Sequence, residues 1–232
     1  MRCLGLLGGM SWESTAIYYR LLNEGVRSRL GGLHSAPLLL WSTDFALIAE
    51  RQAANEWEAL SQQLSEAGRR LVCAGAEALI ICTNTMHRLH ADIARASGVP
   101  VIHIAHATAE ALRKAGCKRP ALLATRFTME GDFYTGRLLD AFGIEAMIPD
   151  EAVRVQIHRI IYDELCRGVV REESRILYRD AIDAMRRDGA DSVILGCTEI
   201  AMLIGASDSE LPLFDTTAIH AEAGVAWIAG SG

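Results

Sequence analysis

Several features that mark common protein classes are missing from the 232-residue sequence. No apolar stretch approaches the roughly 20 residues that a membrane-spanning helix needs. The formal net charge is −6 and the basic residues form no stripe, which argues against nucleic acid or an anionic membrane as a partner. The first residues carry a single arginine and a short apolar run before Gly8-Gly9, so we expect no signal peptide.

The motifs of common cofactors are missing as well. There is no G-x-G-x-x-G, and no lysine follows Gly8-Gly9 as a P-loop requires. The two lysines, Lys114 and Lys118, flank Gly116 in a turn-like segment, so neither is a convincing partner for pyridoxal phosphate. Six cysteines show no C-x-x-C spacing, which is typical of reduced thiols. We therefore expect a cytoplasmic protein without a cofactor.

Short apolar runs alternate with helical patterns along the whole chain, with no linker or low-complexity tract between them. Strands are expected at 3–7, 36–42, 79–82, 100–104, 120–124, 144–148, 193–195 and 211–215. Helices are expected at 12–29, 87–96, 106–115, 131–142, 152–166, 172–187 and 217–228, and the segment 44–74 is expected to be mainly helical. This alternation predicts an α/β protein in which parallel sheets carry helices on both faces.

The sequence repeats itself once. Aligning 80–84 with 194–198 pairs two apolar strand ends that run into polar loops, and it pairs Thr83 with Cys197. Segment 100–104 similarly matches 211–215, and each precedes an alanine-rich helical pattern. A repeat this long indicates a duplicated lobe rather than a solenoid. We expect one lobe to comprise 1–104 with 217–232 and the other 105–216, each donating its last helix to the other.

The stretch VILGCTEI at 193–200 carries the most reactive candidate side chain. Its apolar run predicts a buried strand, Gly196 allows a sharp turn, and Cys197 then lies at the strand's carboxyl end. Open α/β sheets bind their ligands at that edge. A helix beginning near Thr198 and Glu199 would direct its free N–H groups at the sulfur and favour a thiolate. Thr83 is the equivalent residue of the other lobe, and we expect the two to face each other across the cleft between the lobes.

Two polar groups on opposite sides of one carbon suit cofactor-free racemisation. One group removes the α-proton from one face, and the other returns a proton to the opposite face. A thiolate such as that of Cys197 is a usable base when its pKa is close to ambient pH. The carbanion needs hydrogen-bond donors that hold the substrate carboxylate, and Asn84, Thr85 and Thr198 are candidates in the right loops.

Five motifs in order resemble the aspartate/glutamate racemase family over essentially the whole chain. They are GLLGGMSWEST, CTNTMH, Ile-Tyr-x-Glu-Leu-x-x-Gly at 161–168, LGCTEI and LPLFDTTAIHAE. The resemblance is to the aspartate-racemase and broad-specificity branch rather than to glutamate racemases that open with an Asp-Ser-Gly-type loop. It implies two flavodoxin-like lobes related by a pseudo-twofold, an active site between them, no cofactor, and a homodimer. The implied substrate is an amino acid or a small dicarboxylate.

The sequence departs from this family at one catalytic position. The family has one active-site cysteine per lobe, and its first cysteine falls on Thr83, not on Cys82. Neighbours on a strand point to opposite faces, so we expect Thr83 in the site. Threonine is a poor base without an activator, although its hydroxyl can donate or relay a proton. The departure leaves two-base racemisation in doubt for at least one enantiomer.

The resemblance also implies further substrate-binding positions. Those outside the two strand-end loops are Met10, Ser11, Gln52, Thr125 and Thr128, and Glu199 joins Thr198 in the second loop. Arg167 falls where a basic residue of the family reaches the substrate, although a solvated helix-end arginine is an equal alternative.

Other assignments remain open at this stage. His87 and His90 lie three residues apart, but without a third ligand a pair on one helix face is a better interpretation than a metal site. Trp12, Tyr18 and Tyr19 are expected in the core. Two alternative functions are a one-cysteine decarboxylase or isomerase of the same fold, and a catalytically weak amino-acid-binding protein.

Overall fold

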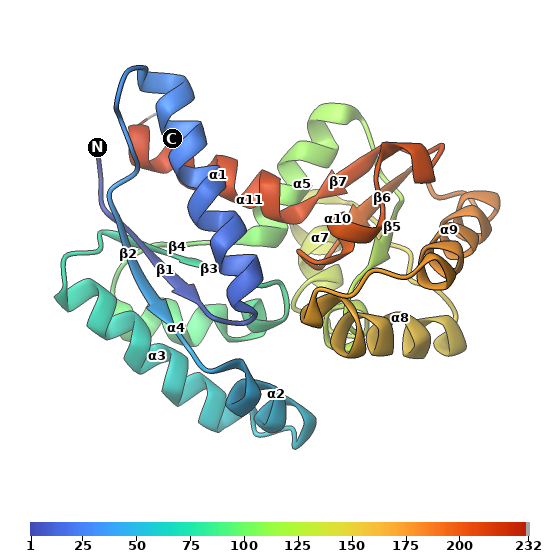
Figure 1. The fold of residues 1–232 in the computed structure, drawn as a ribbon, viewed down its shortest axis with the longest axis horizontal. Helices are drawn as coiled ribbons and strands as arrows, with labels where there is room; N and C mark the ends of the chain where they lie inside the picture. Colours follow the sequence, from blue (N-terminus) through green and yellow to red (C-terminus); the bar gives the residue numbers. More distant parts are fainter. Residues whose placement is uncertain (231–232) are drawn as a thin grey trace. The chain divides into compact units, whose positions relative to one another are not determined.

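The computed structural model describes residues 1–230, which divide into two compact units (Figure 1). The first unit comprises Met1–His103 together with the C-terminal segment from His220, and the second comprises Ile104–Ile219. None of the helices within residues 1–230 is long and apolar enough to cross a membrane. Each unit contains a parallel sheet, which confirms the α/β class expected from the alternating pattern.

The first unit is built on a four-stranded parallel sheet in the order β2-β1-β3-β4. Its strands are β1 (Leu4–Gly8), β2 (Leu38–Ser42), β3 (Ala78–Ile81) and β4 (Val101–Ile102). Its helices are α1 (Trp12–Leu30), α2 (Phe45–Ala53), α3 (Trp57–Cys73), η1 (Thr85–Leu89), α4 (His90–Ser97) and most of α11 (Thr216–Ala229). The central strands β1 and β3 are buried at every position, because a parallel sheet is covered on both faces.

Two apolar layers cover this sheet. Leu7, Leu79 and Ile81 point to one face and pack with residues of α3 and α4. The opposite face packs against α1 and α11, and its core includes Leu4, Leu6, Tyr18, Leu22, Val26, Ile80, Ala221, Val225 and Ile228. Alternation along β1 and β3 therefore directs successive side chains into different cores.

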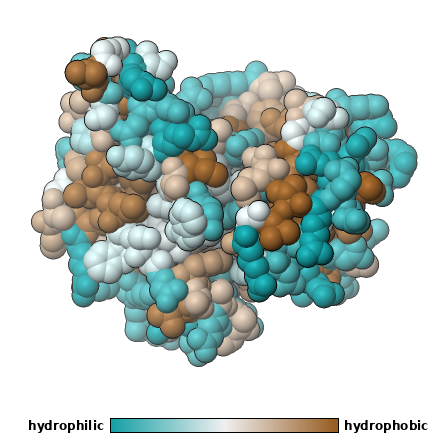
Figure 2. Space-filling view, in the orientation of Figure 1, coloured by the Kyte–Doolittle hydropathy of each residue, from teal (hydrophilic) through white to brown (hydrophobic). Residues whose placement is uncertain are grey.

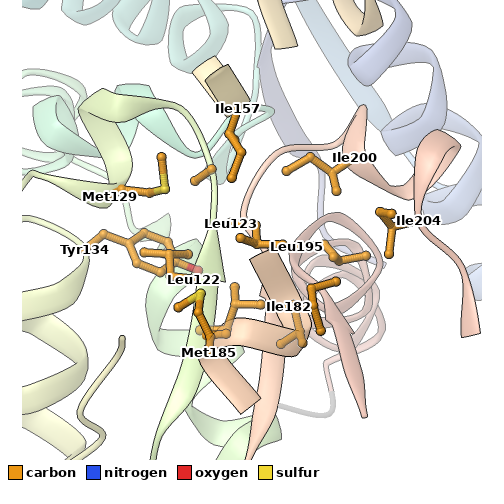
Figure 3. Packing of buried hydrophobic residues seen from close by; sticks show 14 of the residues in the cluster. Leu122, Leu123, Met129, Tyr134, Ile157, Ile182, Met185, Leu195, Ile200 and Ile204 are labelled. Atoms are coloured by element: carbon orange, nitrogen blue, oxygen red, sulfur yellow. The ribbon is translucent and has the colours of Figure 1, made fainter. Parts of the chain in front are cut away.

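The second unit repeats this plan around a three-stranded parallel sheet in the order β5-β6-β7. Its strands are β5 (Pro120–Leu123), β6 (Ser192–Leu195) and β7 (Leu213–Asp215). Its helices are α5 (Ile104–Ala115), α6 (Arg126–Met129), α7 (Thr135–Phe142), α8 (Glu151–Asp163), η2 (Leu165–Arg167), α9 (Glu172–Arg187), α10 (Ile200–Leu203) and η3 (Ala206–Asp208). The buried side chains around β5 and β6 are shown in Figure 3.

The strand expected at 144–148 is wrong. This segment contributes a single parallel bridge, between Met147 and Ala121 of β5, rather than a continuous strand. The bridge nevertheless lies beside β5 as β2 lies beside β1, so both units follow the same strand order. That order, 2-1-3-4, is the flavodoxin-like one.

The segment 44–74 is mainly helical, as expected, and consists of two helices, α2 and α3, with a turn between them at Asn55, whose φ is 57°. Two other expectations need correction. The helix expected from 131 starts only at Thr135 and is preceded by the short α6. Trp12 and Tyr19 are 67% and 56% exposed rather than in the core, whereas Tyr18 is fully buried.

Each unit's core includes the helix that follows the last strand of the other unit. Helix α5 follows β4, yet Ile104, Ala109 and Leu112 lie in the core around β5 and β6. Helix α11 follows β7, yet Val225 packs in the core around β1. On the face shown in Figure 2, hydrophobic residues lie in patches among hydrophilic ones, as is normal for a protein surface.

Candidate active site

Two neighbouring strands deliver polar loops to one edge of the first sheet. Strands β1 and β3 are paired and parallel, so the loops that follow Gly8 and Ile81 begin at the same edge. The Ser14 hydroxyl donates to the Cys82 carbonyl at 3.0 Å and joins these loops. Ser11 is the N-cap of α1, and its hydroxyl accepts a hydrogen bond from the Ser14 N–H at 3.3 Å.

Thr83 is the partly exposed residue of its loop, whereas Cys82, Asn84 and Thr85 are buried. Its N–H donates to the Ile81 carbonyl at 2.8 Å, and its own carbonyl lies 2.8 Å from His87 Nδ1. The sulfur of Cys82 instead lies in the core against α1 and α11, and burial raises the pKa of this thiol well above its usual range. Neighbouring side chains thus point in opposite directions.

The equivalent loop of the second unit begins at Gly196. Its N–H donates to the Leu123 carbonyl at 2.7 Å, and the Thr216 hydroxyl donates to the Leu195 carbonyl at 2.8 Å. A Cβ at Gly196 would lie 2.9 Å from the Cβ of Ala124, so a side chain does not fit there without displacing β5. Cys197 follows as a partly exposed residue, and its next neighbours in sequence are buried.

The sulfur of Cys197 is held by a carboxylate. Its Sγ–H donates to Glu199 Oε2 at 2.9 Å. Burial, the negative charge of Glu199 and the nearby Cys166 together raise the pKa of the Cys197 thiol well above its usual value. This shift of the pKa is opposite to the one expected from a helix N-terminus next to the sulfur. Helix α10 has a single turn, and the adjacent carboxylate favours the protonated sulfur.

Two tyrosines near Cys197 were not predicted from the sequence as part of the site. Burial and then the charge of Cys197 raise the pKa of both Tyr162 and Tyr178. The Tyr178 hydroxyl is buried and has no hydrogen-bond partner within residues 1–230. Tyr162 belongs to the motif at 161–168 that the sequence singled out, whereas Tyr178 carries no motif and is identified only by packing.

The remaining predicted residues divide between the two units. In the first unit, Met10, Ser11 and Gln52 are buried, and the first two follow β1 at the edge described above. In the second unit, Thr125 follows β5 and its hydroxyl lies 3.3 Å from that of Thr128. Further buried members of the predicted set are Asn84, Thr85, Thr198 and Glu199.

Arg167 stands apart from the other predicted residues. It is exposed at the end of η2 and makes no ion pair with any other residue between 1 and 230. Its exposed side chain agrees with either alternative that the sequence left open.

A cluster of four histidines lies beneath the Thr83 loop. His87, His90, His103 and His220, called here the histidine cluster, have ring centroids 4.5–6.4 Å apart in the four measured pairs. The Tyr18 hydroxyl lies 2.8 Å from His220 Nδ1. Within residues 1–230, no three His, Cys, Asp or Glu side chains are placed to hold a metal ion. The sequence showed only the adjacent pair because the other two rings come from distant segments.

Comparison with known proteins gives the family. The model of the Asp/Glu/hydantoin racemase family matches residues 7–224. The chain belongs to that family. The matched range includes both strand-end loops.

Several relatives resemble the whole chain. A crystal structure of a candidate Asp/Glu racemase from Yersinia pestis has 48% identity and a TM-score of 0.92, covering 99% of this chain and 100% of that one. An aspartate racemase homologue from Pyrococcus horikoshii OT3 has 31% identity and a TM-score of 0.84, with the same coverage. A broad-specificity amino-acid racemase of Bacillus subtilis (strain 168) is 21% identical over 228 residues, 96% of each chain.

Proposed function

We propose that the protein is a cofactor-independent amino-acid racemase that acts on aspartate, glutamate or a wider set of amino acids. Its family and its structural relatives support amino-acid racemase activity in general. The observation that carries the specific proposal is the match between the two strand-end loops. In each loop one reactive side chain, Thr83 or Cys197, is partly exposed between buried neighbours.

In the proposed reaction Cys197 and Thr83 serve opposite faces of the α-carbon. The Cys197 thiol first passes its proton to Glu199, to which it is already hydrogen-bonded, and the thiolate then removes the α-proton. The Thr83 hydroxyl donates a proton to the other face of the carbanion and regains one from solvent, and Glu199 releases to solvent the proton that it took. In the reverse direction each group exchanges its role. The hydroxyl is the weaker acid and ionises far less readily than the thiol, so its step limits turnover.

Other residues would bind the substrate. Backbone N–H groups of the two loops, with Asn84, Thr85 and Thr198, would hold the α-carboxylate and spread the carbanion charge. Arg167 would pair with a side-chain carboxylate. Met10, Ser11, Gln52, Thr125 and Thr128 complete the proposed set. We further propose a cytoplasmic homodimer, on the resemblance of the five sequence motifs.

A deuterium experiment tests this function. Protein dialysed against a chelator is incubated in D2O with L- or D-aspartate, glutamate or alanine, and enantiomers are separated by chiral chromatography while α-deuterium is measured by NMR. Racemisation with deuterium uptake, and no aldimine absorbance, supports the proposal. Loss of activity on chelation that zinc restores would refute its metal-free chemistry, and binding without deuterium uptake would leave only an amino-acid-binding protein.

The state of Cys197 supports one alternative. A sulfur that is protonated at rest can donate a proton to one face of an enediolate, as a one-cysteine decarboxylase or isomerase requires. Such an enzyme needs no second group at Thr83. Carbon dioxide release from a substituted malonate, in a protein that racemises no amino acid, would favour this alternative.

A further inference from the structure

We propose that His87 is a positioning residue for Thr83: it fixes the backbone that aims the Thr83 hydroxyl. This inference rests on the proposed function, in which that hydroxyl serves one face of the substrate. His87 touches no reacting atom in the proposal. It acts through the Thr83 carbonyl, from which its Nδ1 lies 2.8 Å away.

The direction of this hydrogen bond follows from its acceptor. A carbonyl oxygen cannot donate, so His87 Nδ1 carries the proton and donates it to Thr83. The preceding carbonyl, that of Cys82, accepts from the Ser14 hydroxyl at 3.0 Å, and the Thr83 N–H donates to Ile81 at 2.8 Å. The peptide groups on both sides of Thr83 are therefore held, one of them by the imidazole.

The ring of His87 is itself held in place by the histidine cluster. It packs 4.8 Å from the ring of His103 and 5.3 Å from that of His220, measured between centroids. His220 is anchored at both nitrogens, because Nε2 donates to the Ile102 carbonyl at 2.9 Å and Nδ1 accepts from the Tyr18 hydroxyl. His90 Nε2 donates to the Val101 carbonyl at 3.0 Å. The cluster thus ties the Thr83 loop to β4, α1 and α11.

In the second unit, the carbonyl of the equivalent reactive residue is held by a different group. Ala201 occupies the position that His87 occupies in the repeat, and no imidazole can reach the Cys197 carbonyl from there. That carbonyl accepts instead from the Ile200 N–H at 3.1 Å. A thiol forms its conjugate base far more readily than a hydroxyl does, so Thr83 is the weaker of the two reacting groups. The additional support therefore lies on the side of the weaker group.

The test compares three variants. His87→Phe keeps a ring but removes the donor, and His87→Asn restores an N–H near the Nδ1 position. His90→Phe is the matched control, because it likewise keeps a ring and removes a donor in the same cluster but leaves the bond to Thr83. Racemisation, α-deuterium exchange without inversion, and hydrogen–deuterium exchange of the backbone over 82–89 are measured for each.

We expect His87→Phe to lower kcat for racemisation by about 10-fold to 100-fold, as misplacement of a reacting group does, with KM nearly unchanged. Exchange at the face served by Cys197 should stay within about 3-fold of wild type, because that step does not use Thr83. Backbone exchange over 82–89 should accelerate. His87→Asn should recover most of both losses, and His90→Phe should keep the wild-type ratio of racemisation to exchange.

Two results would overturn the inference. One is wild-type racemisation in His87→Phe. The other is an equal loss of racemisation and of exchange at the Cys197 face, which would indicate only a structural role. If the wild-type protein neither racemises nor exchanges any amino acid, the proposed function fails by itself. The positioning claim then stands if the 82–89 backbone accelerates in His87→Phe and recovers in His87→Asn, and falls if it does not.

Discussion

The loops at 82–87 and 196–201 follow equivalent strands of the two units, yet different parts of each loop are held. In the first loop, hydrogen bonds from Ser14 and His87 hold the backbone on either side of Thr83. In the second, the reactive atom itself takes part: the sulfur of Cys197 donates a hydrogen bond to Glu199. A duplicated fold thus provides the same position twice and leaves the chemistry of each copy free to diverge.

The difference extends to the ionisable groups around each loop. Imidazoles surround the first loop, and burial lowers the pKa of His87 well below its usual value. Around the second loop, a carboxylate and two further groups with raised pKa values, Tyr162 and Tyr178, adjoin the sulfur. We infer that the first loop is arranged for rigidity and the second for proton movement.

The largest predicted effect tests the thiol of the second loop. Cys197→Ser is nearly isosteric and should leave the melting temperature unchanged. It removes the base, so racemisation and α-deuterium exchange should both fall by about 1,000-fold, within the usual range for general acid–base groups. Chiral chromatography and NMR measure the two rates. Activity within a few-fold of wild type would remove Cys197 from the mechanism.

Glu199→Gln separates hydrogen bonding to the sulfur from proton acceptance. The amide still reaches Sγ but does not take its proton, so racemisation should fall by about 100-fold. The negative charge that raises the pKa of Cys197 is also lost, so alkylation of Cys197 by iodoacetamide near pH 7 should accelerate. Slower racemisation together with faster alkylation would identify Glu199 as the proton acceptor, and slower alkylation in the variant would contradict this role.

Acid should destabilise the first unit more than the second. Burial lowers the pKa of His220 to about 4, whereas an unfolded histidine titrates near its usual 6.5. The unfolded chain binds more protons between these values, so the free energy of unfolding should fall as pH drops from about 6.5 to about 4, by about 3 kcal/mol. Urea unfolding across this range measures it. His220→Gln should flatten the profile, whereas His34→Gln, at an exposed position, should not.

Thr83→Cys makes the two loops chemically alike. A thiol supplies a better acid and base at the slow face, so kcat in the slower direction should rise by about 10-fold. Cys82→Ala should change turnover little, because its sulfur is buried in the core. Early deuterium uptake into each enantiomer distinguishes the faces. Should Cys82→Ala abolish turnover while Thr83→Ala does not, Cys82 is the second base.

The smallest effect concerns Arg167. Because its side chain is exposed, pairing with a substrate carboxylate should contribute only about 1 kcal/mol, or about 5-fold in KM. Arg167→Ala should therefore raise KM for aspartate and glutamate by that factor and leave KM for alanine unchanged. An equal change for all three substrates would place Arg167 outside the side-chain pocket.

The sequence predicted the parts of the fold that depend on local pattern. Apolar runs located β1, β3, β5 and β6 to within a residue or two, because a parallel strand that is buried on both faces has a nearly continuous apolar sequence. The same pattern could have placed Trp12 and Tyr19 at the surface. They lie seven residues apart on one face of α1, beside the buried face that carries Tyr18, Leu22 and Val26.

Other features depend on contacts that no local pattern contains. The histidine cluster joins rings from η1, α4, the end of β4 and α11, so the sequence showed only His87 and His90. The raised pKa of Cys197 depends on where the Glu199 side chain points, which sequence spacing leaves open. The turn at Asn55 has a positive φ, which asparagine adopts more often than most residues. No local sequence pattern predicts this turn.

Because α11 follows the second unit in sequence but packs in the first, the two units complete their folding in an unusual order during synthesis. The second unit is one continuous segment, so its core is complete once residue 219 has emerged. Most of the first unit emerges earlier, but at that point its core lacks Ala221, Val225 and Ile228. The hydrogen bond from Arg2 Nε to the Trp227 carbonyl is also not yet formed. Chains usually fold their N-terminal domain first during synthesis. Here the N-terminal unit finishes after the second unit, because one apolar face of its sheet stays uncovered until α11 has been synthesised.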